Sequence, residues 1–433
     1  MRKIPDVTPP ETITPRTSGI IEQKRTYELI TPLYGGGVTT TEADPITVVR
    51  ATEIRGLLRF WWRVMRGGQS ENGLSLKERE DAIWGKAYEK GDEGISPSKI
   101  IQVVVDVLQK GIPIKPVPIN DIPGYAAFPL LTDQDAHVRQ GVQFILTITY
   151  PARLKDEIEA ALWAWETFGG LGARARRGFG ALHLVAIDGV PYQSLPTSRD
   201  VERWIRDQAR KYSKAGNFPP GVPHLSGTLQ LAVTMPSANP MMAWKNLVRK
   251  LQDFRQQKDA KRRSVWPEAD TIREVAGTGP ASHIKKFPRA AFGLPILFHF
   301  TGKNAPVGNY ILNEANTADS DHPNKERFAS PLILRPFLCS DKQAVGLVLL
   351  LEGSRVDLKQ LVLQDEKNKQ GKNKGVQQVN NTSILNGVLT PDEARAIAQK
   401  SSNSQDRKDT LRVLQNETDV LQAFLKSFKG DRR

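Results

Sequence analysis

Cysteine is almost absent from the chain, which has one such residue, Cys339, among its 433 positions. A single thiol excludes an internal disulfide framework and any zinc site built from several cysteines. Histidine is also sparse: its six residues are scattered singly, with none of the spacings typical of metal ligands, such as His-Glu-x-x-His. We therefore expect no metal ion and no bound cofactor.

Long apolar stretches are absent as well. The longest apolar run is "AVGLVLLL" (344–351), far shorter than the ~20 residues that a membrane-spanning helix needs. The first residues, "MRKIPDVTPPETITPRTSG", lack the apolar core of a secretory signal peptide. These two absences lead us to expect a cytoplasmic protein with no membrane partner.

Positive charge, in contrast, is plentiful. The chain has 61 Lys and Arg residues against 47 Asp and Glu residues, a formal net charge of +14. Such an excess favours a polyanionic partner, either nucleic acid or an anionic membrane surface. Its length of 433 residues also exceeds the size at which one hydrophobic core usually stops growing, so the sequence predicts two domains.

The first predicted domain, residues 1–188, alternates strand and helix patterns. β-branched runs and amphipathic periodicity predict these elements in order: strand 25–33, helix 52–68, strands 99–108 and 142–150, helix 152–168 and strand 180–188. The order β-α-β-β-α-β is that of a ferredoxin-like, or RRM-like, module. Thr52 is the expected N-cap of the first helix, and Gly67 is its expected end.

A second, more heavily decorated module is predicted after a linker at 189–227. It occupies 228–433, with strands at 228–235, 292–300, 331–339 and 344–351 and a helix at 241–254. A polar, low-complexity insertion covers about 359–385, and a C-terminal helix covers 409–428. The predicted fold class is α+β, with two ferredoxin-like modules, the second degenerate.

The stretch "FGGLGARARRGFGAL" (168–182) contains five glycines and three arginines. It follows a helix and opens a strand, the reverse of a Rossmann fingerprint, and it has no Gly-Lys-Ser/Thr step of a P-loop. Glycines such as Gly172 and Gly178 allow backbone amides to approach a phosphate, while Arg174, Arg176 and Arg177 offer bidentate forks. The alternative is a charged turn on the surface.

Other basic residues gather in two places. The helix at 52–68 carries four arginines within roughly one quadrant, and their mutual repulsion suggests a polyanion that neutralises them; solvated surface arginines are the alternative. A later segment, "HIKKFPRAAFG" (283–293), either lines a groove or simply leads into a strand. Trp61 and Trp62 lie on the apolar side of the helix and are expected in the core. The candidate RNA-binding residues of these two segments are Arg55, Arg59, Arg63, Arg66, Lys285, Lys286 and Arg289.

Catalytic signals are weak throughout the sequence. There is no Gly-x-Ser-x-Gly elbow, and nothing indicates activation of Cys339. The fragment "RGFG" (177–180) begins like an RNA-recognition signature, but Ala181 and Leu184 stand where that family has aromatic residues. We therefore expect a protein that is not an enzyme, although a lone histidine or aspartate acting on RNA remains open.

Together these segments resemble the RAMP proteins of CRISPR systems, and more narrowly the family of first subunits of type III-B (Cmr) RNA-guided effector complexes. The resemblance rests on "TPLYGGG" (31–37), "IRGLLRFWWR" (54–63) and "FGGLGARARRGFG" (168–180). The later segments "VWPEADTIRE" (265–274), "FPRAAFGLPILFHF" (287–300) and "SPLILRP" (330–336) are similar to the C-terminal module of that family.

The resemblance implies a non-catalytic RNA-binding subunit of an antiviral ribonucleoprotein. Its partners would be the 3′ region of a CRISPR guide RNA, single-stranded target RNA and other RAMP subunits. The turn glycines Gly35, Gly36 and Gly37 would join the glycine loop and the helix arginines on one face. Two alternatives stay open: a RAMP-type endoribonuclease that processes precursor guide RNA, and a free-standing RNA-binding module.

Overall fold

The computed structural model describes most of the chain. With one exception, the candidate RNA-binding residues named above lie within the described part. Gly36 and most of the polar insertion lie outside the described residues. The described residues are 19–35, 37, 44–68, 73–86, 100–131, 135–214, 216–225, 229–300, 305–306, 308–315, 328–353, 355–365, 385–402, 414 and 417–428.

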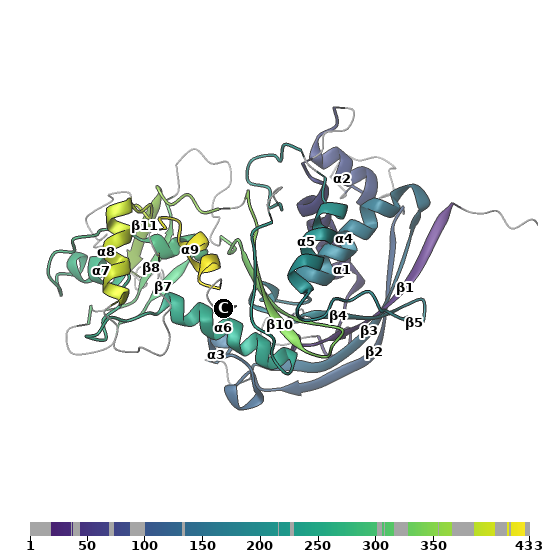
Figure 1. Cartoon of the computed structure of the whole chain (residues 1–433), viewed down its shortest axis with the longest axis horizontal. Helices are drawn as coiled ribbons and strands as arrows, with labels where there is room; N and C mark the ends of the chain where they lie inside the picture. Colours follow the sequence, from purple (N-terminus) through teal and green to yellow (C-terminus); the bar gives the residue numbers. More distant parts are fainter. Residues whose placement is uncertain are drawn as a thin grey trace, which may run out of the picture.

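The N-terminal module has the predicted order of elements. Its main elements are β1 (Ile20–Leu29), α1 (Ala51–Arg66), β2 (Gln102–Ile114), β3 (Val138–Pro151), α4 (Lys155–Phe168) and β4 (Leu182–Ile187). With β5 (Val190–Pro191), the strands form one antiparallel sheet in the order β2-β3-β1-β4-β5. The helices α1 and α4 lie on one side of this sheet (Figure 1). This is the arrangement of a ferredoxin-like module.

The predicted boundaries of α1 were wrong at its start. The N-cap residue is Arg50, which has an extended backbone and makes no side-chain capping hydrogen bond. Thr52 therefore lies inside the helix. Gly67 follows the last helical residue, as predicted. Two short helices interrupt the connections of this module: α2 (Leu76–Trp84), which starts with a capping box at Ser75, and α3 (Gly124–Ala127).

The second half of the chain contributes two three-stranded sheets. The first has the order β6-β10-β9, from β6 (Leu231–Val233), β9 (Leu332–Leu338) and β10 (Ala344–Leu350). The second has the order β11-β8-β7, from β7 (Ile296–Phe298), β8 (Tyr310–Glu314) and β11 (Leu361–Asp365). The helices are α5 (Val201–Tyr212), α6 (Pro240–Arg255), α7 (Glu268–Val275), α8 (Pro391–Ser402) and α9 (Val420–Lys426).

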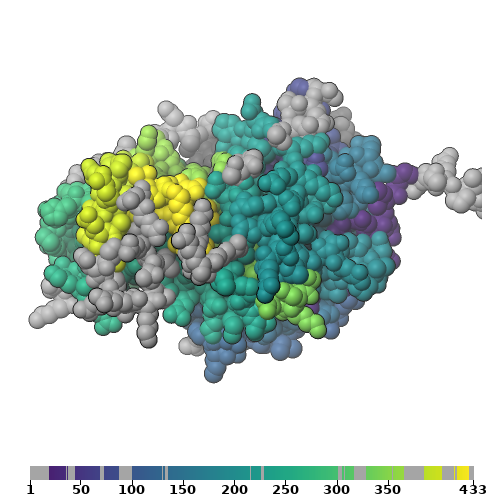
Figure 2. Space-filling model, in the orientation of Figure 1, coloured from purple at the N-terminus to yellow at the C-terminus, as the bar shows by residue number. Residues whose placement is uncertain are grey.

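The mixed α+β class with antiparallel sheets is therefore confirmed. In the second half, β6 and α6 are followed by β9 and β10 only after α7, β7 and β8, and α6 packs on β9 and β10. The described part of this sheet has three strands, so a duplicated ferredoxin-like module and its boundaries stay predictions. In the space-filling view, the first described residues lie at one end of the molecule and the C-terminal helices lie toward the other (Figure 2).

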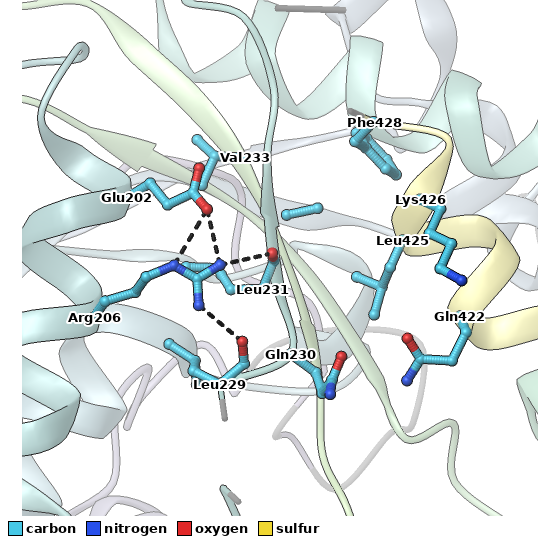
Figure 3. A pocket seen from close by; sticks show the side chains of 11 residues that line it. Glu202, Arg206, Leu229, Gln230, Leu231, Val233, Gln422, Leu425, Lys426 and Phe428 are labelled. Atoms are coloured by element: carbon cyan, nitrogen blue, oxygen red, sulfur yellow. Dashed lines mark hydrogen bonds and ion pairs between the residues drawn. The ribbon is translucent and has the colours of Figure 1, made fainter. Parts of the chain in front are cut away.

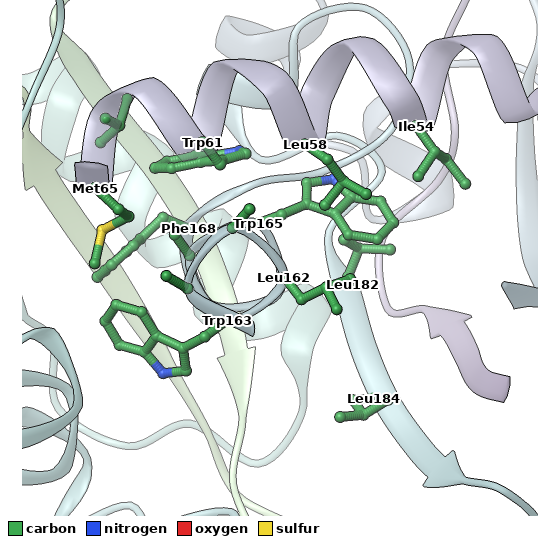
Figure 4. Close-up of a cluster of buried hydrophobic side chains, with 14 of the residues drawn as sticks. Ile54, Leu58, Trp61, Met65, Leu162, Trp163, Trp165, Phe168, Leu182 and Leu184 are labelled. Carbon is green, nitrogen blue, oxygen red and sulfur yellow. The ribbon is translucent and has the colours of Figure 1, made fainter. Parts of the chain in front are cut away.

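One hydrophobic cluster joins the two halves. It contains buried side chains of α1 and α4 together with others from β4, β9 and β10 (Figure 4). Trp61 and Trp62 are 2% and 1% exposed, which confirms that both are core residues. The Trp61 ring lies 6.0 Å from the ring of Phe168, at the end of α4. Because the glycine-rich stretch begins there, the core fixes its starting point.

Candidate nucleic-acid interface

The glycine- and arginine-rich stretch (169–180, the Gly/Arg loop) is wedged between the two halves of the chain. The indole Nε1 of Trp244, on α6, donates a hydrogen bond of 2.7 Å to the carbonyl of Arg177. From the N-terminal module, the hydroxyl of Thr31 donates to the carbonyl of Gly178 at 2.7 Å. Buried Arg335, on β9, donates to the carbonyl of Gly169 at 3.0 Å. Both halves therefore hold the backbone of this loop in place.

The loop glycines are required by close packing. Gly172 and Gly178 have φ values of +75° and +89°, a region that side chains with a Cβ rarely occupy. A Cβ on Gly172 would lie 2.3 Å from the carbonyl oxygen of Tyr34, and one on Gly178 would lie 2.4 Å from Nε1 of Trp244. Neither substitution fits without movement of the backbone or of a buried ring.

The amides of these two glycines are already used. The Gly172 amide donates to Oε1 of Glu53 at 2.6 Å, and the Gly178 amide donates to the carbonyl of Ala175 at 3.0 Å. The expectation that these amides cradle a phosphate is corrected here, because both have acceptors within the chain. The amides of Gly172 and Gly178 are therefore not available to an anion, whereas the arginine side chains of the loop line the cavity.

The Tyr34–Gly37 turn and the Gly/Arg loop do lie together. The amide of Ala173 donates to the carbonyl of Tyr34 at 2.7 Å, and the rings of Tyr34 and Phe179 are 5.9 Å apart. Gly35 has a φ of +72°, consistent with its place in a tight turn. Tyr34 therefore supports the loop through its carbonyl and its ring.

The three loop arginines each donate to a backbone carbonyl. Arg174 Nε donates to Ala126 at 2.6 Å, Arg176 Nη1 donates to Ser330 at 2.5 Å, and Arg177 Nη1 donates to Leu332 at 3.2 Å. A guanidinium has five N–H donors, so each retains donors for a ligand. Within the described part of the chain, none of the three forms an ion pair with a carboxylate.

Burial makes this lack of a counter-charge costly. Desolvation lowers the pKa of all three guanidinium groups, and at Arg177 the charge of nearby Arg255 lowers it further. Guanidinium groups nevertheless stay protonated at neutral pH. The loop therefore concentrates positive charge in a partly desolvated place, where an anion is bound more strongly than in water.

A cavity of about 660 Å³ opens beside these arginines. Leu57, Phe60 and Trp61 of α1 form one wall, and Ser330 and Ile333 contribute from the second half of the chain. The guanidinium carbon of Arg176 lies 5.7 Å from the centre of the Phe60 ring. The cavity thus combines an apolar and aromatic wall with cationic donors, which suits a nucleotide base and its phosphate.

The α1 arginines are engaged elsewhere. Arg59 and Arg63 both pair with Glu80 of α2 at 2.6 Å, and Arg55 donates to the carbonyl of Ile101 at 2.7 Å and to that of Trp84. Arg66 is buried and donates to the carbonyl of Asp156 at 2.8 Å.

This arrangement removes the argument that the helix stripe requires a polyanion. For Arg59, Arg63 and Arg66 the neutralising carboxylates belong to the chain itself, whereas Arg55 is bound to backbone carbonyls. At about 100° per residue, Arg59 lies about 160° around α1 from Trp61, on nearly the opposite side from the cavity. The stripe therefore does not converge with the Gly/Arg loop, and an RNA contact of these arginines stays a prediction without support from the geometry.

The basic residues before β7 also have partners. Lys285 Nζ pairs with Glu274 at 2.5 Å, and Arg289 pairs with fully buried Glu268 at 3.1 Å. Lys286 is half-buried and forms an isolated bridge with Asn386 through its backbone. The side chains of these three residues are not part of the cavity wall.

A second cavity, of about 330 Å³, offers a contrast. It lies between α5, β6 and α9, and its arginine, Arg206, is bound by a carboxylate and by backbone carbonyls (Figure 3). Arg206 donates to Oε1 of Glu202 at 2.8 Å and 3.2 Å and to the carbonyl of Leu229 at 3.0 Å. Its positive charge is neutralised, so this cavity has weaker attraction for an anion.

The histidines that the structure describes do not gather into a metal-binding cluster. His183, on β4, has its pKa lowered to about 4 by desolvation and by the charge of Arg335. A neutral, partly buried imidazole is consistent with a structural role. Among the described residues, no three side chains of the His, Cys, Asp or Glu types are placed to hold a metal ion. None of the helices described is both long and apolar enough to cross a bilayer.

Sequence reasoning missed the cavity wall and Glu53, the acid that binds the Gly172 amide. Phe60 is one of many apolar residues in the helix pattern, so the sequence does not distinguish it. Ser330 lies about 150 residues from the loop, so no local signal links it to the loop. Glu53 precedes Leu57 by one helical turn, and this spacing places both on one face of α1.

Comparison with known proteins gives a family match for part of this chain. Residues 26–183, which form most of the N-terminal module, match the model of the RAMP superfamily. No curated protein matches the chain.

Solved structures of type III-B proteins are similar to the chain at low identity. The apo form of Cmr1 from Pyrococcus furiosus is 17% identical, with a TM-score of 0.46, over 79% of this chain and 94% of that one. A chain of the type III-B Cmr-beta complex bound to cognate target RNA is 12% identical, with a TM-score of 0.46, over 78% of this chain and 97% of that one.

Proposed function

We propose that the chain is a non-catalytic RNA-binding subunit of a type III-B CRISPR ribonucleoprotein. It would contact the 3′ region of the guide RNA, the single-stranded target RNA, or both, and would work in the cytoplasm beside other RAMP subunits. The match of residues 26–183 to the RAMP superfamily model supports the assignment to CRISPR RNA.

One observation carries the RNA-binding part of the proposal. Arg174, Arg176 and Arg177 line an open cavity without a carboxylate partner in the described residues, whereas other arginines of the chain, such as Arg59 and Arg63, are paired. A site that gathers unpaired guanidinium groups beside aromatic rings recognises phosphate and base together.

The geometry also indicates whether the site distinguishes one RNA base from another. The cavity is in the size range of small-ligand pockets, which fits one or two nucleotides of a strand. Its donors are guanidinium groups that contact phosphate, and such contacts position a strand without reading its sequence. We therefore expect slight base preference, as a subunit that handles many guides requires.

The experiment is photo-crosslinking of a single-stranded RNA that carries 4-thiouridine to the purified chain, followed by peptide mapping. We expect crosslinks within 169–180 and at Phe60 or Trp61. Crosslinks confined to α5 or to the α1 arginines would refute the assigned site. Incubation with CRISPR repeat RNA in EDTA is the second arm, since RAMP nucleases need no metal. Specific cleavage there would favour the endoribonuclease alternative.

Copurification from the native host tests the cellular part of the proposal. RNA retained by the tagged chain should be enriched in CRISPR guide sequences, together with other RAMP subunits. A chain that retains only bulk cellular RNA and no RAMP partner would instead be a free-standing RNA-binding module.

A further inference from the structure

Glu53 binds the backbone of the Gly/Arg loop at Gly172, a residue that lines the same cavity as the loop arginines. It lies in the first turn of α1, one turn before the cavity residue Leu57, and accepts the hydrogen bond of 2.6 Å from the amide of Gly172. Its side chain is half-buried, and burial raises its pKa, opposed by that hydrogen bond and by the charge of Arg50.

The Gly/Arg loop is therefore polarised along its length. Gly172, at its start, is bound to an acid, while Arg176 and Arg177, a turn further on, are fixed to carbonyls of the second half of the chain. A phosphate is attracted to the arginine end and repelled from the Glu53 end. The group that a carboxylate favours at its own end is a neutral hydrogen-bond donor.

Glu53 has the capacity to accept a further hydrogen bond. A carboxylate offers about four acceptor positions on two oxygens. Within the described residues, its one hydrogen bond is to Oε1, and no donor is bound to Oε2.

From this polarity we propose that Glu53 accepts a hydrogen bond from the ribose 2′-hydroxyl of a nucleotide whose phosphate lies on the loop arginines. The inference rests on the proposed RNA-binding function and adds discrimination of RNA from DNA to it. The 2′-hydroxyl is the donor present at every position of an RNA strand, whereas base amino groups vary with sequence. A site that holds phosphates without reading bases therefore meets the ribose donor in every register.

The test compares the binding of rU12 and dU12, two strands that differ only at the 2′ position, by the full-length chain. A hydrogen bond to a charged acceptor corresponds to a preference of about tenfold for rU12. In Glu53→Ala we expect this preference to fall toward one, because rU12 loses a hydrogen bond that dU12 never makes.

Two control variants separate this role from support of the loop. Glu53→Gln keeps an acceptor for the Gly172 amide, and Asp106→Asn removes one exposed acidic charge on β2. Equal weakening of rU12 and dU12 in Glu53→Ala, restored in Glu53→Gln, would mean that Glu53 only supports the loop and would overturn the inference. So would a wild-type chain that binds both strands equally, or a loss of preference in Asp106→Asn. Failure of the wild-type chain to bind either strand would instead contradict the proposed function.

Discussion

Replacing Arg174 and Arg176 together by alanine should weaken RNA binding in a way that depends on salt. Each guanidinium makes one hydrogen bond to a backbone carbonyl, of Ala126 and of Ser330, and neither has a carboxylate partner among the described residues. Their remaining donors are therefore the natural contacts for two phosphates. Their loss should remove two phosphate contacts without exposing an unpaired acid.

The size of the effect follows from counterion release. For single-stranded nucleic acid, the logarithm of the binding constant falls with the logarithm of the salt concentration by about 0.7 per phosphate contact. Removing two contacts should flatten this slope by about 1.4. Between 50 and 200 mM salt, those two contacts account for about a sevenfold change in affinity, which the double variant should lose.

Fluorescence anisotropy of a labelled single-stranded RNA, at several salt concentrations, measures the slope directly. The matched control is Arg203→Ala with Arg210→Ala on α5, which lowers the net charge by the same amount. These two side chains are 77% and 76% exposed and pair with acids of their own helix, so their loss should cost little stability. An equal flattening in both double variants would mean that net charge alone governs binding. An unchanged slope in the loop variant would refute the assigned phosphate site.

Three further predictions concern the frame of this site. Gly178→Ala forces a Cβ to 2.4 Å from Nε1 of Trp244 at a φ of +89°, so we expect a loss of more than about 2 kcal/mol in urea unfolding; an unfolding midpoint equal to wild type would contradict the packing role. Trp61→Ala should cost about 3 kcal/mol or more because the ring is 2% exposed, and a variant that melts normally would contradict its core role. His183 has a pKa near 4 in the folded chain against an ordinary 6.5, so the unfolded chain takes up the proton first as the pH falls. Stability should therefore drop by about 2 kcal/mol between pH 7 and pH 5, and His183→Gln should lose that dependence in urea titrations at both pH values.

The N-terminal module was predictable because its signals are local. In β3, residues such as Phe144, Leu146 and Ile148 alternate with partly exposed ones, and this period of two is legible in the sequence. In α1, Leu58 and Trp61 repeat at helical spacing and are buried. The cap assigned to Thr52 depended on a single residue rather than on a period, and that prediction was wrong.

The role of the arginines was not predictable in the same way. From the sequence, Arg59 and Arg63 form an uncompensated stripe. Their counter-charge, Glu80, lies on a separate short helix, α2, and the fold brings it to within 2.6 Å of both. Sequence spacing reports charges along one helix but not those that another helix places against it, so a paired stripe and an RNA-binding stripe look the same.

The Gly/Arg loop was singled out for a reason that proved incomplete. Its glycines suggested amides directed at a phosphate, but the amide of Gly172 is bound to Glu53. A Cβ at Gly178 would strike Trp244, from the far half of the chain. Partners about 70 or more residues away leave no trace in a local pattern.

Two requirements therefore act on the same short loop. Its glycines let the backbone pass between the two halves of the chain, and its arginines hold carbonyls of the second half, such as that of Ser330, while facing a cavity walled by α1. An anion bound at these arginines would also offset the repulsion among guanidinium groups that packing has brought together. At the proposed site, RNA binding and the joining of the two halves would depend on the same side chains. This shared dependence would explain why positive charge and glycine occur together here: the glycines allow the close approach of the two halves, and the arginines gathered there would bind the anion.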